Sequence, residues 1–284
     1  MAELFEYLTE PMQYAFMQRA LLMAILVGLV CAVFSCFLVL KGWSLMGDAV
    51  SHAVLPGIVI AYILAIPLSI GAFIGGLFCA VATGYVKDNS RLKEDAIMGI
   101  IFSGMFALGL VIYLKVQPEI HLDHILFGNI LGVQAADLWE TGIICAATLG
   151  LIVVRRHDLL LYCFDQAYAR AIGLPVKLIH YALLVALSLT IVASLKAVGV
   201  ILVIAMLIAP GAIAYLLTNR FSHMLLISSV VAVGSSVAGV FVSFYLDADT
   251  GATIILIQTF IFILAFLFAP TSGILRKKIV SQNS

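Results

Sequence analysis

Charged side chains are scarce in this sequence. Only 11% of its 284 residues are charged, whereas 64% are hydrophobic. Water-soluble domains contain about 25% charged and about 45–50% apolar residues. A chain of this composition cannot cover its surface with polar groups, so much of that surface must contact lipid. The composition excludes a water-soluble globular protein and indicates an integral membrane protein.

Several other features are missing. The sequence has no GxxxxGK[ST] phosphate loop, and its longest polar interruption, residues 155–177, is too short to fold alone. None of the five cysteines belongs to a CxxC pair, which disfavours a disulfide framework and a thiolate metal site. We therefore predict one transmembrane domain over residues 1–284, with no permanently bound cofactor and no nucleic-acid partner. We predict that the chain is not an enzyme, and if its function costs ATP, another subunit must bind the nucleotide.

Long apolar runs are the main feature that is present. A bilayer core about 30 Å thick requires about 20 apolar residues of helix, and the alternation typical of a β-barrel is absent. We predict an all-α, polytopic helical membrane protein with about nine transmembrane helices. The expected spans are 20–40, 45–66, 67–86, 96–114, 138–154, 178–195, 197–218, 222–246 and 251–270.

The distribution of basic residues predicts the orientation. Lys and Arg concentrate on the cytoplasmic side of membrane proteins, and an outside N-terminus with a cytoplasmic C-terminus leaves only Arg19, Lys115 and Lys196 outside. The remaining twelve lie inside: Lys41, Lys87, Arg91, Lys93, Arg155, Arg156, Arg170, Lys177, Arg220, Arg276, Lys277 and Lys278. We therefore expect a multi-pass protein of the inner (cytoplasmic) membrane, with its helices in contact with lipid.

The stretch SLMGDAVSHAVLPG, Ser44–Gly57, places charge inside the second apolar run. Asp48 and His52 are four residues apart, so they lie on one helix face, roughly 6 and 12 Å from the cytoplasmic end. An aspartate at mid-membrane costs about 2.5–3.5 kcal/mol and normally faces the bundle interior or a wet cavity. The small residues around this pair, Ser51 among them, would allow neighbouring helices to approach closely.

Pro56 follows His52 by four residues and is itself followed by Gly57. Proline has no N–H to donate to the His52 carbonyl, so we expect a helix break beside the charged pair. Transporters build mid-membrane sites from interrupted helices. A carboxylate, an imidazole and a carbonyl together suit a divalent metal such as manganese, iron(II) or zinc.

A structural interpretation competes with the metal site. Asp48 could cap a helix that starts late, and His52 could be a packed polar residue. The metal interpretation has a constraint of its own, because Asp48 and His52 supply two ligands where such ions usually take four to six. Either other helices contribute, or two copies of the chain meet at this face. We favour the dimer.

These residues carry a resemblance to a known family. SLMGDAVSHAVLPG resembles the membrane permease of ABC importers for manganese, iron(II) and zinc. Three further stretches are similar to that family and occur in its order: DHILFGNILGV (123–133), CFDQAYARAIGLPVKLIHYALL (163–184) and VGVILVIAMLIAPGAIAYLL (198–217). The form SHAVLPG, with its proline, is similar to the manganese and iron branch rather than to the zinc permeases.

The resemblance implies a homodimeric permease. It implies two cytoplasmic ATP-binding subunits, an extracytoplasmic metal-binding solute-binding protein, and a transported ion bound by Asp48 and His52. It also identifies residues 155–177 as a coupling-helix segment that the ATPase grips, with Asp165, Ala169 and Gly173 as the matched positions. From the residues alone, Asp165 caps a short helix, 166–172, that Gly173 ends, and an amphipathic helix on the membrane surface is an equal alternative.

Two further features stay open. Pro210 in AMLIAPGAIA frees the carbonyl of Met206 and could line the pathway opposite Pro56, although packing explains it equally well. His121, Asp123 and His124 cluster in a predicted outer loop, where a metal relay and a simple polar loop compete, and we do not assign them as ligands.

The leading hypothesis is therefore a divalent-metal ABC permease for manganese or iron(II), with its pathway at the homodimer interface. A zinc-specific permease is the first alternative. A proton-coupled secondary transporter is the second. An intramembrane enzyme that uses Asp48 and His52 as an acid–base pair is disfavoured, because the sequence offers no nucleophile nearby beyond Ser51.

Overall fold

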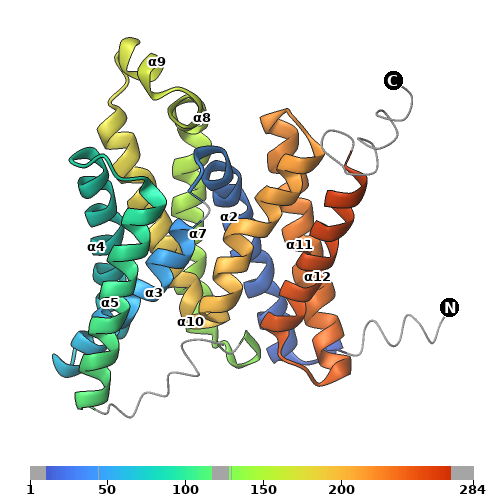
Figure 1. Cartoon of the computed structure of the whole chain (residues 1–284). Helices are drawn as coiled ribbons and strands as arrows, with labels where there is room; N and C mark the ends of the chain where they lie inside the picture. The colour runs from blue at the N-terminus through green and yellow to red at the C-terminus, as the bar shows by residue number, and fades with distance from the viewer. Residues whose placement is uncertain (1–10, 44, 117–127, 129, 270–284) are drawn as a thin grey trace, which may run out of the picture.

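The computed structural model describes residues 11–43, 45–116, 128 and 130–269. In this part of the chain all regular structure is helical (Figure 1). The α-helices are α2 (Ala15–Lys41), α3 (Met46–Ile63), α4 (Leu68–Asp88), α5 (Glu94–Val116), α7 (Ala135–Val154), α8 (Arg156–Phe164), α9 (Gln166–Ala171), α10 (Val176–Leu217), α11 (Phe221–Leu246) and α12 (Thr250–Phe268); 3-10 turns form at η1 (Pro11–Gln13) and η2 (Ile130–Gly132).

The described residues contain nine segments long and apolar enough to cross a membrane. Seven of them are α2, α3, α4, α5, α7, α11 and α12, and α10 supplies two, Val176–Leu195 and Ala197–Leu217. The predicted all-α bundle of nine spans is thereby confirmed, and the predicted bounds lie within five residues of the observed ones.

The two spans of α10 meet at a glycine. Gly199 has φ 76° and ψ 168°, which interrupts the helix between its two arms. In Figure 1 the arms diverge from their lower ends as a V, so α10 is a tight helical hairpin. Gly128 packs against this turn, because a Cβ added to Gly128 would collide with the backbone of Val198 and Gly199. Only glycine accommodates both the positive φ and the close approach.

The core lies where α2 and α3 pack against α10. Its largest fully buried side chains include Phe34 and Phe37 of α2, Met46 of α3 and Leu183 of α10. On its other side α3 packs closely against α4, with Gly75 beneath the carbonyl of Ala53. The face of α3 that carries charge is therefore the one not taken up by these neighbours.

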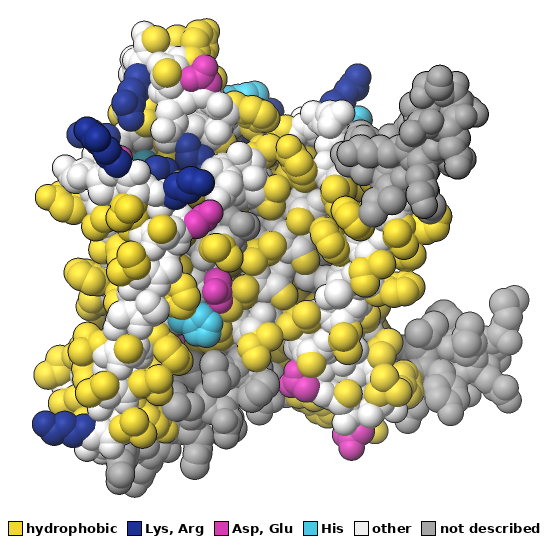
Figure 2. All heavy atoms as spheres, viewed as in Figure 1, with side chains coloured by type: hydrophobic (Ala, Val, Ile, Leu, Met, Phe, Trp, Pro, Cys, Tyr) yellow, Lys and Arg dark blue, Asp and Glu magenta, His cyan; other side chains and the backbone are white. Residues whose placement is uncertain are grey.

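Basic side chains gather at one end of the bundle. Figure 2 shows Lys and Arg at the upper end, where Figure 1 places the short helices α8 and α9. The helix ends on that side carry Lys41, Lys87, Arg155, Arg156, Arg170, Lys177 and Arg220.

Candidate metal site

The link between α2 and α3 positions the charged residues. α2 ends at Gly42, whose φ of 74° is left-handed, and the next N–H, that of Trp43, donates to the Leu38 carbonyl at 2.8 Å. This closure stops α2 and lets α3 begin within a few residues. Asp48 is thus the third residue of α3 and lies in its first turn, where the helix dipole favours a negative charge. It does not occupy the N-cap position, which belongs to Leu45.

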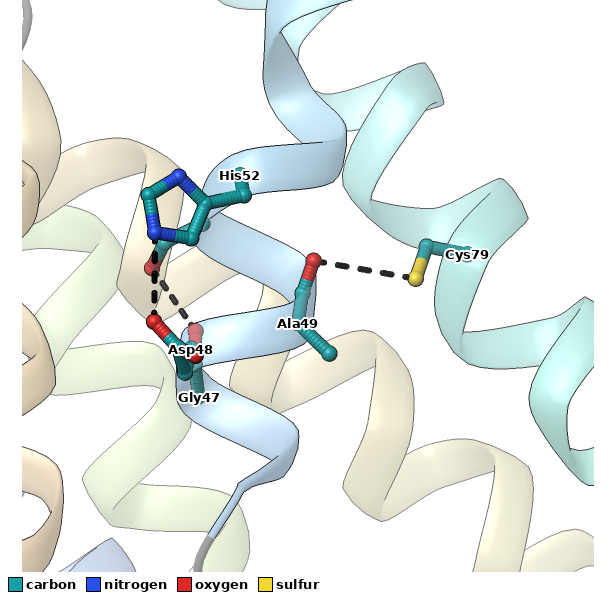
Figure 3. A network of polar contacts seen from close by, with 6 residues as sticks. Gly47, Asp48, Ala49, His52 and Cys79 are labelled. Carbon is teal, nitrogen blue, oxygen red and sulfur yellow. Dashed lines mark hydrogen bonds and ion pairs between the residues drawn. The ribbon is translucent and has the colours of Figure 1, made fainter. Parts of the chain in front are cut away.

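Asp48 and His52 contact each other on one face of α3. The Nε2 atom of His52 lies 3.2 Å from Oδ1 of Asp48, and their side chains are 29% and 32% exposed. Figure 3 shows both side chains on the side of α3 away from Cys79 of α4. Figure 2 shows a histidine and an acidic side chain side by side in the middle of an otherwise apolar face. The predicted pair is therefore together, and it opens outward from the chain.

The polar groups of α3 near the pair are taken up by packing contacts and by the helix itself. On the face opposite Asp48 and His52, the Cys79 Sγ–H donates to the Ala49 carbonyl at 3.8 Å. The Ser51 hydroxyl donates back to the Gly47 carbonyl at 2.7 Å. Ser51 is only 3% exposed. The Ser51 hydroxyl therefore satisfies its own helix and does not face the open side that Asp48 and His52 share.

Two aromatic rings of α5 lie beside the imidazole. Phe102 stacks on His52 with ring centroids 6.1 Å apart, and Phe106 meets its ring edge-on at 5.4 Å. Aromatic neighbours hold a ring in place. The two phenylalanine rings offer the imidazole no polar partner on their side, and Nε2 lies beside Asp48. The sequence analysis did not identify Phe102 and Phe106 as neighbours of His52, although their i, i+4 spacing indicates a shared helix face.

The geometry of the pair suits one shared ion. Two donor atoms that each lie about 2.1 Å from a tetrahedral or octahedral metal are about 3.0–3.4 Å apart, and Oδ1 and Nε2 are 3.2 Å apart. The described residues hold no group of three or more His, Cys, Asp and Glu side chains that could complete a metal site. At this position the described residues therefore offer two potential ligands, Asp48 and His52.

The expected break at Pro56 does not occur. α3 runs as one helix through Pro56, from Met46 to Ile63, because a proline removes only one hydrogen bond when its neighbours make room for the ring. That room comes from α5, where a Cβ on Gly109 would lie 2.8 Å from the Pro56 nitrogen. Gly57 is likewise a packing residue, because a Cβ there would collide with the Gly71 carbonyl of α4.

Pro210 also lies in a continuous helical arm. It is buried, and the Ser35 hydroxyl of α2 bridges the adjacent backbone. That hydroxyl donates to the Ile208 carbonyl at 3.1 Å and accepts the Gly211 N–H at 2.9 Å. The bridge accounts for Pro210 by packing between α2 and α10. The irregular backbone expected at the two prolines is found at Gly199 instead.

The polar segment 155–177 folds as two short helices at the basic end. α9 begins where the Asp165 carboxylate accepts the N–H groups of Ala167 and Tyr168, both at 2.9 Å. It ends at Ala171, and Gly173, with a φ of 84°, follows two residues later. The predicted short helix, its cap and its terminating glycine are confirmed. α8 was not predicted as a helix.

The positions in and beside α9 that match the family's coupling-helix segment, Asp165, Ala169 and Gly173, differ in exposure. Ala169 is fully buried and holds α9 against the protein. The large apolar side chains exposed in and beside α9 are Phe164, Tyr168 and Ile172, which are 67%, 56% and 52% exposed. We refer to these three residues, which the sequence analysis did not single out, as the exposed patch. His121, Asp123 and His124 lie outside the described residues.

Known proteins resemble the whole chain. A model of the ABC 3 transport family matches residues 13–269. The chain is 57% identical to the chelated iron transport system membrane protein YfeD of Yersinia pestis, over 93% of this chain and 89% of that protein. It is 53% identical to the manganese transport system membrane protein MntB of Synechocystis sp., over 96% and 89%.

A solved structure shares the fold. PsaBC from Streptococcus pneumoniae in complex with Fab contains a chain that superposes with a TM-score of 0.85 at 40% identity, covering 97% of this chain and 99% of that one. Family model, relatives and structure all span nearly the full length. The chain therefore belongs to the ABC 3 transport family.

Proposed function

We propose that this chain is the membrane permease of an ABC importer for divalent metal ions, with manganese and iron(II) as its substrates. The observation that carries the proposal is the Asp48–His52 contact, 3.2 Å long and about a third exposed, on an apolar face. Ionisable residues at this depth are expensive to insert and mark ion pathways. Relatives named for manganese and chelated iron transport support the choice of metals.

Two copies of the chain complete the site. If the open faces of two α3 helices meet, two Asp48 carboxylates and two His52 imidazoles supply four ligands and two negative charges to one M²⁺. The exposure of both side chains supports this arrangement, since a site complete within one copy would be enclosed. The ion would then pass between the two copies, along the homodimer interface.

The energy would come from ATPase subunits bound at the basic end. Basic residues mark the cytoplasmic side of membrane proteins, and on that rule α8, α9 and the C-terminus would lie in the cytoplasm and the N-terminus outside. The patch Phe164, Tyr168 and Ile172 would dock one ATPase per permease copy. A solute-binding protein would deliver the metal to the opposite end. ATP-driven rocking of the two copies would then expose the site to each side in turn.

The proposed ligands favour manganese and iron(II) by their coordination geometry. They do not bind zinc more weakly than these two metals. Zinc stands above both metals in the general order of binding strength, so selection must come from geometry and from metal availability. Four protein ligands in an open interface leave space for water, which suits ions that take six ligands better than tetrahedral zinc. A zinc-specific permease remains the alternative that metal competition tests.

Transport by the reconstituted complex tests the proposal. The permease would be placed in liposomes with its ATPase subunits and solute-binding protein, and uptake of radiolabelled manganese measured with and without ATP. We expect uptake only with ATP and the full complex, and competition by iron(II). Metal movement by the permease alone down a proton gradient would contradict the proposal and favour a secondary transporter. Competition by zinc alone would reassign the substrate.

A further inference from the structure

Two buried rings and one half-buried ring meet where the basic end of the bundle joins the membrane core. The Tyr162 hydroxyl and His180 Nδ1 are hydrogen-bonded at 2.7 Å. The indole of Trp43 meets the His180 ring edge-on at 5.3 Å and the Tyr162 ring at 6.5 Å. Trp43 and Tyr162 are 1% and 0% exposed. We call Trp43, Tyr162 and His180 the junction cluster.

The junction cluster joins three separate elements of the fold. Tyr162 belongs to α8, which leads directly into α9 and the patch assigned to ATPase docking. His180 belongs to the first arm of α10, and Trp43 lies in the link between α2 and α3. A displacement of α8 must therefore act on α10 through the hydrogen bond and on the α2–α3 link through the edge-on ring contacts.

The surroundings leave the rings little freedom. The Lys41 ammonium lies 4.3 Å above the Tyr162 ring, and the Lys87 ammonium lies 5.9 Å from the centre of the Trp43 ring. Such cation–π contacts stabilise one ring orientation. Gly84 of α4 closes the other side, since a Cβ there would lie 2.8 Å from His180 Nε2. Close-packed groups of this kind transmit displacement instead of absorbing it.

Trp43 connects the junction cluster to the metal-bearing helix. Its carbonyl accepts the Met46 N–H at 3.0 Å, at the start of α3. Asp48 lies two residues beyond Met46, about 3 Å along the helix axis. A shift or rotation of Trp43 therefore moves the first turn of α3, and that turn carries the Asp48 carboxylate.

We propose that Tyr162 and His180 are positioning residues that link ATPase-driven movement of α8 and α9 to the Asp48–His52 site, through Trp43. The inference rests on the proposed function and adds a route between the docking helix and the ion. Neither residue touches the metal. Their contribution is to make each movement of the docking helix rearrange the two ligands.

Removing one oxygen atom tests the link. Tyr162→Phe deletes the hydrogen bond to His180 and keeps the ring on which Trp43 and Lys41 pack. In liposomes with the complete transporter, manganese imported and ATP hydrolysed would be measured on the same preparation. We expect normal assembly with the ATPase and continued ATP hydrolysis. Manganese imported per ATP should fall about fivefold, the factor that one hydrogen bond of ordinary strength supplies.

Tyr85→Phe is the matched control. Tyr85 lies in α4 next to Gly84, at the same end of the bundle as the junction cluster, but its side chain is 64% exposed. This variant should keep the wild-type ratio of manganese imported to ATP hydrolysed. An unchanged ratio in Tyr162→Phe overturns the inference. So does an equal fall of both rates with a lower melting temperature, which would indicate a purely structural role. If Tyr162→Phe fails to assemble, Gly84→Ala, which displaces the imidazole, is judged by the same ratio. Absence of ATP-driven import by the wild type would instead refute the proposed function.

Discussion

Gly57 of α3 and Gly71 of α4 lie so close that neither position has room for a side chain: a Cβ on either would collide with the carbonyl of the other. The contact is backbone against backbone, so no side-chain rotation can relieve it. We predict that Gly57→Ala destabilises the folded permease by about 1–3 kcal/mol, the usual cost of overpacking. Thermal unfolding of the purified protein, and its level in the membrane, measure the effect.

Gly104→Ala is the control for that experiment. Gly104 lies in α5 with nothing within 4 Å of an added Cβ, and alanine is the better helix former by about 1 kcal/mol. This variant should be neutral or slightly more stable. Equal stability of Gly57→Ala and Gly104→Ala would show that the approach of α3 to α4 is looser than described.

The end of α9 offers a test of ATPase docking. Gly173 has φ 84° and open space around an added Cβ, so the cost of Gly173→Ala is confined to the backbone and amounts to about 1–2 kcal/mol. We predict that Gly173→Ala weakens association with the ATPase about tenfold, the equivalent of about 1.4 kcal/mol. Binding of manganese by the permease should be unchanged. Pull-down with the purified ATPase subunit measures the first quantity.

Gly173→Asn separates strain from other effects, because asparagine tolerates the left-handed conformation better than alanine does. It should restore most of the lost association. If asparagine and alanine weaken docking equally, backbone strain at the end of α9 is not the cause.

The buried thiol of Cys163 in α8 should be unreactive towards alkylating reagents. Burial raises the pKa of Cys163 from its ordinary value of 9.0 to about 12, although the charge of Lys41 opposes the change. The thiolate is the reactive form, so N-ethylmaleimide should leave Cys163 unmodified in the folded protein from pH 7 to pH 9. Because the folded state keeps this proton above pH 9 and the unfolded state loses it, the stability it contributes declines between pH 9 and 12. Mass spectrometry after labelling checks the first point.

Ile172→Cys provides the positive control, since Ile172 is 52% exposed at the end of α9. That introduced thiol should react within the same period. Rapid labelling of Cys163 in the native membrane would show that α8 separates from α2 more readily than its packing indicates.

The proposed metal site, shared by two copies of the chain, predicts that the two copies can be cross-linked at this position. All five cysteines are buried, so a single introduced thiol reports on its own position. Asp48→Cys should give a covalent dimer with a short bismaleimide, because two copies would place position 48 on either side of one ion. Ile143→Cys on α7, where the native side chain is 67% exposed, should not. A monomer in both cases on a denaturing gel would contradict the shared site.

Much of the fold follows from the sequence, because lipid imposes a simple requirement. Each crossing needs about 20 apolar residues, so the runs in the sequence correspond directly to the spans, even at the α10 hairpin. The same local logic placed Asp48 and His52 on one helix face and Asp165 at the start of α9. In each case the information lies within a few residues of the chain.

What escaped prediction depends on contacts between distant segments. Phe102 and Phe106 flank His52 only because α5 packs beside α3. Residue spacing within either helix does not predict which helices pack together. Pro56 suggested a break, but Gly109 on another helix makes room for its ring and α3 continues. The junction cluster likewise joins residues more than a hundred positions apart. Identifying these contacts requires the packed structure.

Uptake by the Asp48→Asn variant tests the central claim most directly. Asparagine keeps the size of the side chain and removes its charge, so two copies would lose both negative charges that they offer the ion. Radiolabelled manganese would be measured in cells that carry the complete transporter, at matched amounts of permease and bound ATPase. We predict that uptake falls at least about tenfold, the effect of losing about 1.4 kcal/mol of ion binding. Wild-type uptake by this variant would contradict the account and place the metal site elsewhere.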